Sequence, residues 1–234
     1  MNTSETSAEH EGSGADGFSS KQEKLDRLEA SAIVLFSSHG FEGTSLRDIA
    51  AHADVPLSMI DRYFGSKIEL FNEVQRNIWK QINIDRDALL QNPIARTSEG
   101  SPTLDAVLHA VIHPVVARAV GNDRQAPMVR LLRENTSMRV HMGLGRGPKH
   151  VVQAENWVDA VMAACPQLTP GEAVWALSFV IGTMYCGQLL DGWLDDLMPP
   201  TSPASAEYIT KLMVDFCSAG VHALSAKRGR TVSA

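Results

Sequence analysis

The amino-acid sequence predicts an all-α protein built from two unequal helical domains. Hydrophobic residues make up 44% of the 234 positions and aromatic residues only 6%, and much of the hydrophobic content is Ala, Leu, Val and Met. That mixture favours helices over sheets. Apolar residues also recur every three or four positions through most of the chain, and no alternating run between turn pairs indicates a strand.

The chain begins with a polar segment that we expect to be a disordered tail. Residues 1–19 are rich in Ser, Gly, Glu and Ala, and they hold too little apolar surface to offset the entropy of ordering. One of the two serines that close this segment can cap a first helix, whose apolar stripe starts at Leu25. The helix is expected to end at His39, because Gly40 can adopt the left-handed conformation that terminates helices.

The segment from Thr44 to Lys67 predicts two short helices joined by a tight turn. Thr44 or Ser45 can cap the first helix, and Asp54 falls in the turn, where a residue that tolerates a positive φ is needed. Pro56 then opens the second helix. Two helices arranged in this way form a helix-turn-helix, whose second helix can enter the major groove of DNA.

This segment resembles the N-terminal part of TetR-type transcriptional repressors over roughly residues 21–80. The resemblance is carried by FEGTSLRDIA at residues 41–50, by Val55 and by RYFGSK at residues 62–67. Two residues depart from the family pattern. Asp54 stands where the family usually has Gly, and Asp61 stands where it usually has a neutral or basic residue.

The resemblance implies a dimeric, ligand-responsive transcriptional regulator, and specifically a repressor, that binds a pseudo-palindromic double-stranded DNA operator. It implies a helix-turn-helix domain at residues 20–80 and a helical ligand-binding and dimerisation domain at residues 81–226, followed by a basic tail at residues 227–234. The residues expected to contact phosphates are Thr44, Ser45, Tyr63 and Lys67. The residues expected to face or flank the bases are Arg47, Ser58, Met59, Asp61 and Arg62.

The charge balance leaves a second interpretation open. The chain has a net charge of −6, and the segment from Lys21 to Lys80 carries eight basic and nine acidic side chains, a net charge of −1. DNA binding would therefore depend on where the basic residues lie, because positive potential is needed only along the phosphates. The alternative is a helical ligand-binding or interaction protein whose helix-turn-helix no longer binds DNA.

The rest of the chain also shows helical periodicity, interrupted by Pro and Gly. Thr103 can cap one of these helices, and Thr169 with Glu172 forms a capping-box pattern at the start of another. The further helices are expected at residues 68–90, 104–120, 127–140, 151–164, 170–192 and 204–225.

The last two helices are the most apolar part of the chain. The helix that follows Thr169 is apolar on two faces and therefore needs two partners. One face can pack within its own subunit and the other against a second copy, which gives a four-helix dimer interface. A buried helix pair in a monomer is the alternative. The residues assigned to the dimer interface are Leu177, Ile181, Met184, Leu212, Phe216 and Gly220.

A small-molecule effector would bind among the C-terminal helices, where apolar walls can combine with a few polar groups. The sequence does not identify the effector. The candidate pocket residues are His113, Arg118, Arg130, Gln153, Trp157 and Trp175.

The sequence gives no support for catalysis or for a cofactor. His109 and His113 have the spacing of two metal ligands on a helix, but no third ligand follows at a matching offset. The Gly-rich segment at residues 142–150 lacks the Lys-Ser/Thr ending of a phosphate-binding loop. We therefore expect no enzyme activity and no metal. With no secretory or membrane-spanning pattern and no C-x-x-C pair among the three cysteines, we expect a cytoplasmic protein.

Overall fold

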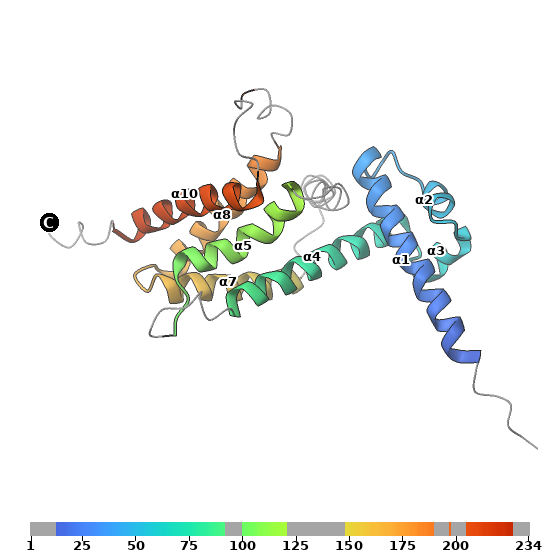
Figure 1. Cartoon of the computed structure of the whole chain (residues 1–234), viewed down its shortest axis with the longest axis horizontal. Coiled ribbons are helices and arrows are strands. Elements are labelled where there is room, and N and C mark those ends of the chain that lie inside the picture. The colour runs from blue at the N-terminus through green and yellow to red at the C-terminus, as the bar shows by residue number, and fades with distance from the viewer. Residues whose placement is uncertain (1–12, 92–99, 121–147, 190–196, 198–204, 227–234) are drawn as a thin grey trace, which may run out of the picture. The chain divides into compact units, whose positions relative to one another are not determined.

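The computed structural model describes residues 13–91, 100–120, 148–189, 197 and 205–226, and every regular element among them is an α-helix (Figure 1). The all-α fold class is thereby confirmed. The chain divides into two compact units, Met1–Val74 and Gln75–Ala234, so the division falls a few residues before the expected boundary at residue 80. The helix expected at residues 127–140 and the basic tail at residues 227–234 lie outside the described residues.

The N-terminal unit contains α1 (Ser13–His39), α2 (Leu46–Ala53), α3 (Leu57–Tyr63) and the first turns of α4 (Lys67–Gln91). Because α1 already begins at Ser13, the expectation of a disordered tail up to residue 19 is wrong for residues 13–19. Once a helix has formed, each added residue gains a hydrogen bond without a new nucleation cost, and no Pro stops this extension. The predicted end of α1 is confirmed, since His39 is its last residue and Gly40 has a φ of 72°.

The core of the N-terminal unit is apolar and draws on all four helices. Phe41, in the loop after α1, packs its ring against Phe36 and Phe71, with ring centroids 5.9 and 5.1 Å away. Short helices such as α2 and α3 are not stable alone, so this core is what fixes their positions. The fully buried apolar side chains are Leu28, Ala32, Phe36, Ile49, Ile60, Leu70 and Phe71.

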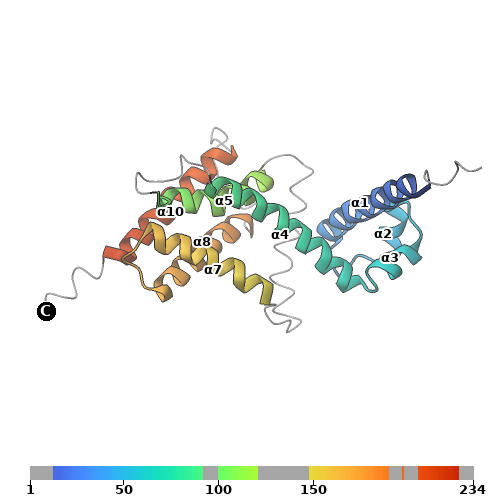
Figure 2. The same ribbon diagram turned by 90° about the horizontal axis from the view of Figure 1, so that it is seen from below.

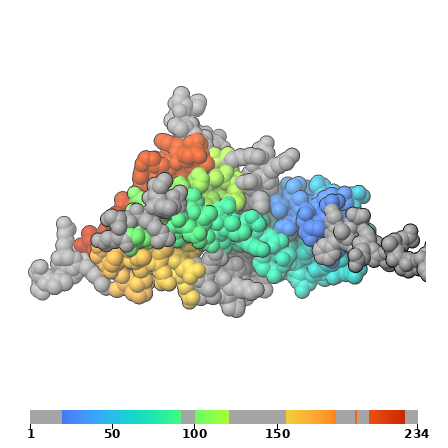
Figure 3. All heavy atoms as spheres, turned by 60° about the horizontal axis from the view of Figure 1, so that its bottom comes forward, coloured from blue at the N-terminus to red at the C-terminus, as the bar shows by residue number. Residues whose placement is uncertain are grey.

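The C-terminal unit contains the remainder of α4 together with α5 (Leu104–Val120), α7 (Pro148–Ala164), α8 (Pro170–Leu189) and α10 (Ala206–Ala226) (Figure 2). The most extensive helix packing is that of α5 against α10, and Figure 3 shows the red atoms of α10 lying on the green atoms of α5. The predicted caps of α5 and α8 are confirmed. Thr103 Oγ1 accepts a hydrogen bond from the Ala106 amide, and the Thr169 amide and hydroxyl donate to the Glu172 carboxylate.

Among the described residues of the C-terminal unit, one charged side chain is buried. Arg86 of α4 is 7% exposed, and its guanidinium donates hydrogen bonds from Nε and Nη2 to the Val111 carbonyl of α5, at 3.2 and 2.9 Å. The guanidinium carbon also lies 5.6 Å from the ring centroid of Trp79 and 5.9 Å from that of Trp157. Arg86 thus ties α4 to α5 and α7 from inside the unit.

Candidate nucleic-acid interface

The first helix of the helix-turn-helix is fixed by a capping box. Ser45 Oγ accepts a hydrogen bond from the Asp48 amide, while the Asp48 carboxylate accepts from the Ser45 amide and hydroxyl. These hydrogen bonds favour the charged carboxylate and lower the pKa of Asp48 below its ordinary value. Ser45 is exposed, so it caps α2 and also lies at the surface, where a phosphate contact was expected.

Thr44 does not lie where the sequence placed it. Its side chain is 2% exposed, and its hydroxyl donates to the carbonyls of Leu35 and Gly40, at 3.1 and 2.8 Å. The expectation that the Thr44 side chain holds a phosphate is therefore corrected. A hydroxyl next to a helix start can serve the backbone of a preceding loop as well as it can serve an amide or a phosphate.

Lys67, the first residue of α4, holds the loop that precedes α2. Its Nζ donates to the carbonyls of Phe41 and Thr44, at 2.8 and 3.1 Å, and lies 4.3 Å from the Phe41 ring centroid. An ammonium group has three donors, and these two bonds leave a third. Its contact with a phosphate remains a prediction.

The turn between α2 and α3 has the left-handed geometry expected from its position. Asp54 has φ 53° and ψ 53°, and its amide closes the end of α2 on the carbonyls of Ala50 and Ala51. A non-glycine residue in this region carries a steric cost, although Asp tolerates it better than most residues do. Arg27 of α1 donates to the Asp54 carbonyl at 3.2 Å, and a His52–Ser31 hydrogen bond of 2.9 Å joins α2 to α1 nearby.

The second helix, α3, is anchored by one side and exposed on the other. Ile60 is fully buried, whereas Ser58, Asp61 and Arg62 are exposed at spacings of three and four that place them on one helical face. Met59 is half-buried, and Tyr63 is 36% exposed. This face of α3, which a helix-turn-helix presents to a groove, therefore carries one acidic, one basic and one neutral hydrogen-bonding side chain.

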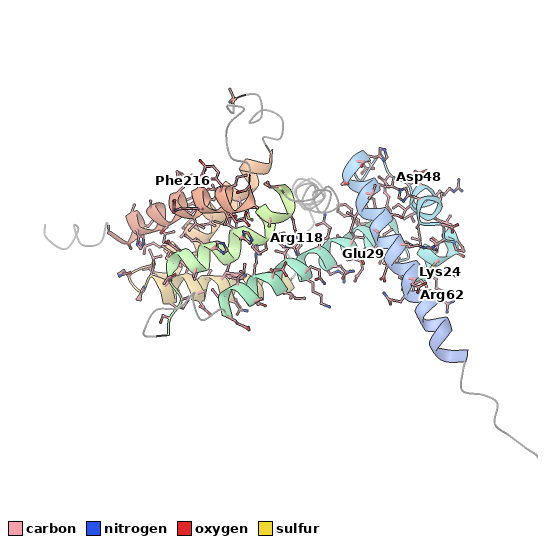
Figure 4. The ribbon with its side chains drawn as sticks, viewed as in Figure 1. Lys24, Glu29, Asp48, Arg62, Arg118 and Phe216 are labelled. Atoms are coloured by element: carbon pink, nitrogen blue, oxygen red, sulfur yellow. The ribbon has the colours of Figure 1, made fainter. Side chains whose placement is uncertain are left out.

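The pocket residues predicted in the C-terminal unit do not form one described cavity. Arg118, labelled in Figure 4, is 13% exposed. Its Nη2 lies 2.6 Å from Asp85 Oδ2, so its charge is already paired. Trp157 is buried in the core beside Arg86. Trp175 is 63% exposed, which corrects its assignment to a pocket. Arg130 and the Gln153 side chain lie outside the described residues.

His113 is the predicted pocket residue with the most suggestive surroundings. It is half-buried, its Nδ1 lies 3.3 Å from Thr210 Oγ1, and its ring stacks on that of His109 with centroids 4.8 Å apart. Burial, with a smaller contribution from the neighbouring His113, lowers the pKa of His109. Among the residues described, no three or more His, Cys, Asp or Glu side chains come together in a way that could hold a metal ion.

The predicted dimer residues separate into two groups. Leu177 and Met184 are 6% and 2% exposed and pack inside their own subunit, so their assignment to the interface is corrected. Because α8 is apolar on both faces, its sequence periodicity could not say which face is internal. Ile181, Leu212, Phe216 and Gly220 are exposed. Trp175 and Phe179, which the sequence analysis did not assign to this surface, stack beside them with centroids 5.8 Å apart.

Comparisons with known proteins agree with this geometry. Residues 29–74 match the family of bacterial regulatory proteins named tetR, and residues 109–220 match the tetracyclin repressor-like C-terminal domain. The chain belongs to the TetR family of transcriptional regulators. Members of this family regulate transcription and are not enzymes. The two matched segments fall in the two different compact units of this regulator.

A short segment of the chain is also similar to one bacterial relative. A Bacillus subtilis (strain 168) protein named "Probable HTH-type transcriptional regulator YttP" is 48% identical over 42 residues, which span 18% of this regulator and 20% of the relative. The matched segment is therefore about a fifth of that relative's length.

Solved structures show the same fold over most of the chain. A Streptomyces coelicolor transcriptional regulator has a TM-score of 0.60 at 16% identity, covering 83% of this regulator and 96% of that chain. A TetR-like regulator from Rhodococcus sp. RHA1 has a TM-score of 0.55 at 14% identity, covering 85% and 96%. The ketosteroid transcriptional regulator KstR2 of Mycobacterium tuberculosis has a TM-score of 0.54 at 16% identity, covering 84% and 93%. No helix in the described part of this regulator is long and apolar enough to cross a membrane.

Proposed function

We propose that this TetR-family regulator is a ligand-responsive repressor that binds a pseudo-palindromic operator as a homodimer in the cytoplasm. The observation that carries the proposal is α3, whose buried Ile60 fixes a face on which Ser58, Asp61 and Arg62 are exposed. Side chains of this kind can read base edges once the helix lies in the major groove.

The contacts divide into two groups by their chemistry. Ser45, Tyr63 and the third donor of Lys67 would bind phosphates and set the register of the helix on the duplex. The residues that would face or flank the bases are Arg47, Ser58, Met59, Asp61 and Arg62. Within this group Asp61 is the most specific, because a carboxylate repels phosphates but can accept a hydrogen bond from the N4 amine of cytosine.

Dimerisation would use the outer face of α8 and α10. This face exposes Trp175, Phe179, Ile181, Leu212 and Phe216, at 63%, 58%, 36%, 49% and 71%. A groove of about 450 Å³ between the two helices is lined by Phe216, Gly220 and their neighbours. An exposed apolar face of this kind is typical of an interface between proteins, and a second copy presents the same face about a two-fold axis.

Effector binding among the C-terminal helices would change how the dimer is distributed between conformations with different spacings of the two α3 helices. A ligand that binds one spacing of the two α3 helices better than another shifts the dimer toward that spacing. If the favoured spacing does not fit the operator, repression is lifted. His113, half-buried beside His109 and Thr210, is the residue we would test first for effector contact.

The test is a fluorescence anisotropy titration of a labelled duplex from the promoter region next to the protein's own gene. Arg62→Ala should weaken binding, whereas Lys80→Ala, which removes one exposed charge from the other unit, should not. If neither this duplex nor any duplex selected from a random pool is bound, the helix-turn-helix no longer binds DNA, and the ligand-binding alternative takes its place.

The same titration decides the role of Asp61. If it accepts a hydrogen bond from cytosine, Asp61→Asn should cost about 1–3 kcal/mol on the cognate duplex while binding to a scrambled duplex improves. Equal gains on both duplexes would show a merely repulsive charge.

A further inference from the structure

The turn between α2 and α3 holds a backbone conformation that its residue does not favour. Asp54 has φ 53° and ψ 53°, and among the described residues it is the one residue other than glycine with a positive φ. In this region the Cβ atom of an L-residue lies too close to the backbone carbonyl, a steric cost that glycine avoids. A conformation of this kind persists only where surrounding contacts hold it.

The contact that holds Asp54 comes from α1. Nη2 of Arg27 donates a hydrogen bond of 3.2 Å to the Asp54 carbonyl, across 27 positions of the chain. Ser31 lies one helical turn after Arg27 on the same face of α1; it is buried, and its Oγ lies 2.9 Å from Nδ1 of His52. Helix α1 therefore contacts both the last turn of α2 and the residue that ends it.

Helix α3 depends on this turn for its direction. It has seven residues, its N-cap residue Pro56 makes no side-chain capping bond, and Ile60 is its one buried side chain. A helix this short is not stable alone. Its first residue, Leu57, follows Asp54 by three positions, so the conformation at Asp54 sets how the exposed face of α3 is presented.

We propose that Arg27 is a positioning residue for α3, because its bond to the Asp54 carbonyl holds the left-handed turn in the conformation that lets α3 read DNA. This inference rests on the proposed DNA binding, and it leaves the residues assigned to phosphates and bases unchanged. When the bond is lost, fewer molecules have α3 correctly placed, and the apparent affinity falls with that fraction. Contacts to bases need this placement more than contacts to phosphates do, so the loss is larger on the cognate duplex than on a scrambled one.

The first experiment compares Arg27→Met with Lys24→Met in anisotropy titrations of the cognate and scrambled duplexes. Each variant loses one positive charge from an exposed position of α1, where Figure 4 labels Lys24. Arg27→Met should bind the cognate duplex about three- to tenfold more weakly than Lys24→Met does, with a smaller difference on the scrambled duplex. Arg27→Lys keeps a charged donor and should retain most of the affinity. Equal losses on both duplexes, or equal effects of the two Met variants, would make Arg27 a general surface charge and overturn the proposal.

The second experiment removes the need for the bond. Asp54→Gly introduces a residue that adopts a positive φ without steric cost. In this background Arg27→Met should lower the cognate affinity by less than about twofold, because the two residues act through the same turn. If Arg27→Met costs as much in the Asp54→Gly background as in wild type, Arg27 does not act through the turn.

A third measurement needs no DNA and separates this inference from the proposed function. At the turn, the Val55 amide donates to the Ala50 carbonyl at 3.0 Å, and in the same unit the Leu70 amide donates to the Ser66 carbonyl at 3.0 Å. Arg27→Met should speed hydrogen exchange of the Val55 amide by about threefold or more and leave that of the Leu70 amide unchanged.

The exchange rates and the titrations fail in different ways. Unchanged exchange at Val55, or equal acceleration at Val55 and Leu70, would overturn the inference even if the wild type binds DNA. If the wild type binds no duplex while the Val55 amide responds as expected, the proposed function fails and Arg27 still holds the turn.

Discussion

The two units of this regulator are stabilised in different ways. In the N-terminal unit, polar side chains reach back to the backbone: Thr44 to two carbonyls, Lys67 to two more, and Arg27 to the turn at Asp54. In the C-terminal unit, helices of 17 to 21 residues pack mainly through apolar contacts. In the N-terminal unit these directional bonds add to the apolar core that fixes the short helices, whereas burial of apolar area alone does not specify which face of a helix is buried.

This difference has a consequence for the surfaces. The surface of the N-terminal unit is mainly polar, and its helix α3 is held in place by the buried Ile60. Apolar packing leaves α8 and α10 with an outer face that still exposes large side chains such as Phe216 (Figure 4). The N-terminal unit therefore presents a polar helix face, and the C-terminal unit presents an exposed apolar face, which the proposed function assigns to DNA and to a second copy.

The largest expected effect separates the two faces of the C-terminal helices. Leu177→Glu places an unpaired charge inside the subunit and should lower the free energy of unfolding by about 3–5 kcal/mol. Phe216→Glu changes an exposed residue, so it should leave the subunit folded and weaken the dimer at least about thirtyfold. Urea denaturation measures the first and light scattering the second. A wild type that is monomeric by light scattering would remove the dimer from the proposal.

The next largest effect is expected at Arg86, the buried charged side chain described in the C-terminal unit. Arg86→Met removes the charge-assisted hydrogen bonds to the Val111 carbonyl and should lower the free energy of unfolding by about 1.5–3 kcal/mol. Arg118→Met, which breaks a pair with the half-exposed Asp85, should cost only about 1 kcal/mol or less. Equal losses in urea denaturation would show that Arg86 contributes no more than the partly exposed Arg118–Asp85 pair.

A smaller effect is expected from the polar contacts of the N-terminal unit. Thr44→Val leaves the carbonyls of Leu35 and Gly40 without the hydroxyl and should cost about 1–2 kcal/mol, while Thr44→Ser keeps most of the stability. The check is thermal unfolding alongside duplex binding. Should Thr44→Val weaken DNA binding with no change in stability, the hydroxyl would be a phosphate contact after all.

The smallest effect concerns pH and the capping box of α2. The pKa of Asp48 is lowered in the folded chain by its bonds with Ser45, so the folded state favours the carboxylate. The stabilisation is present above the ordinary Asp pKa of 3.8 and is lost as the pH falls through the lower, folded value. In thermal unfolding between about pH 7 and pH 3, Asp48→Asn should show a weaker pH dependence than wild type. Parallel curves would contradict this.

Local features of the fold could be predicted from the sequence because their causes are local. Gly40 and Asp54 take the left-handed conformations expected of them, and the Thr169–Glu172 capping box forms as its spacing indicates. The reading face of α3 followed in the same way from helical spacing around Ile60.

The incorrect predictions depended on three-dimensional context. Spacing shows that α8 has two apolar faces but not which is internal, so Leu177 and Met184 were assigned to the wrong one. The hydroxyl of Thr44 could have served a helix, a loop or a phosphate. Arg86 was missed although it continues the stripe of Ile78 and Ile82 at a spacing of four, an unusual place for a charge and the one signal that could have found it.

The tryptophans give this regulator built-in optical reporters. Trp175 is 63% exposed on the outer face of α8, so covering it with a second copy would move its indole from water to an apolar setting and shift its emission to shorter wavelength. Trp157 is 6% exposed and lies beside the Arg86 guanidinium, so its emission changes when the interior loosens. Comparing wild type with single Trp→Phe replacements at these two positions would show how much of the emission change on assembly and on unfolding comes from each of the two tryptophans.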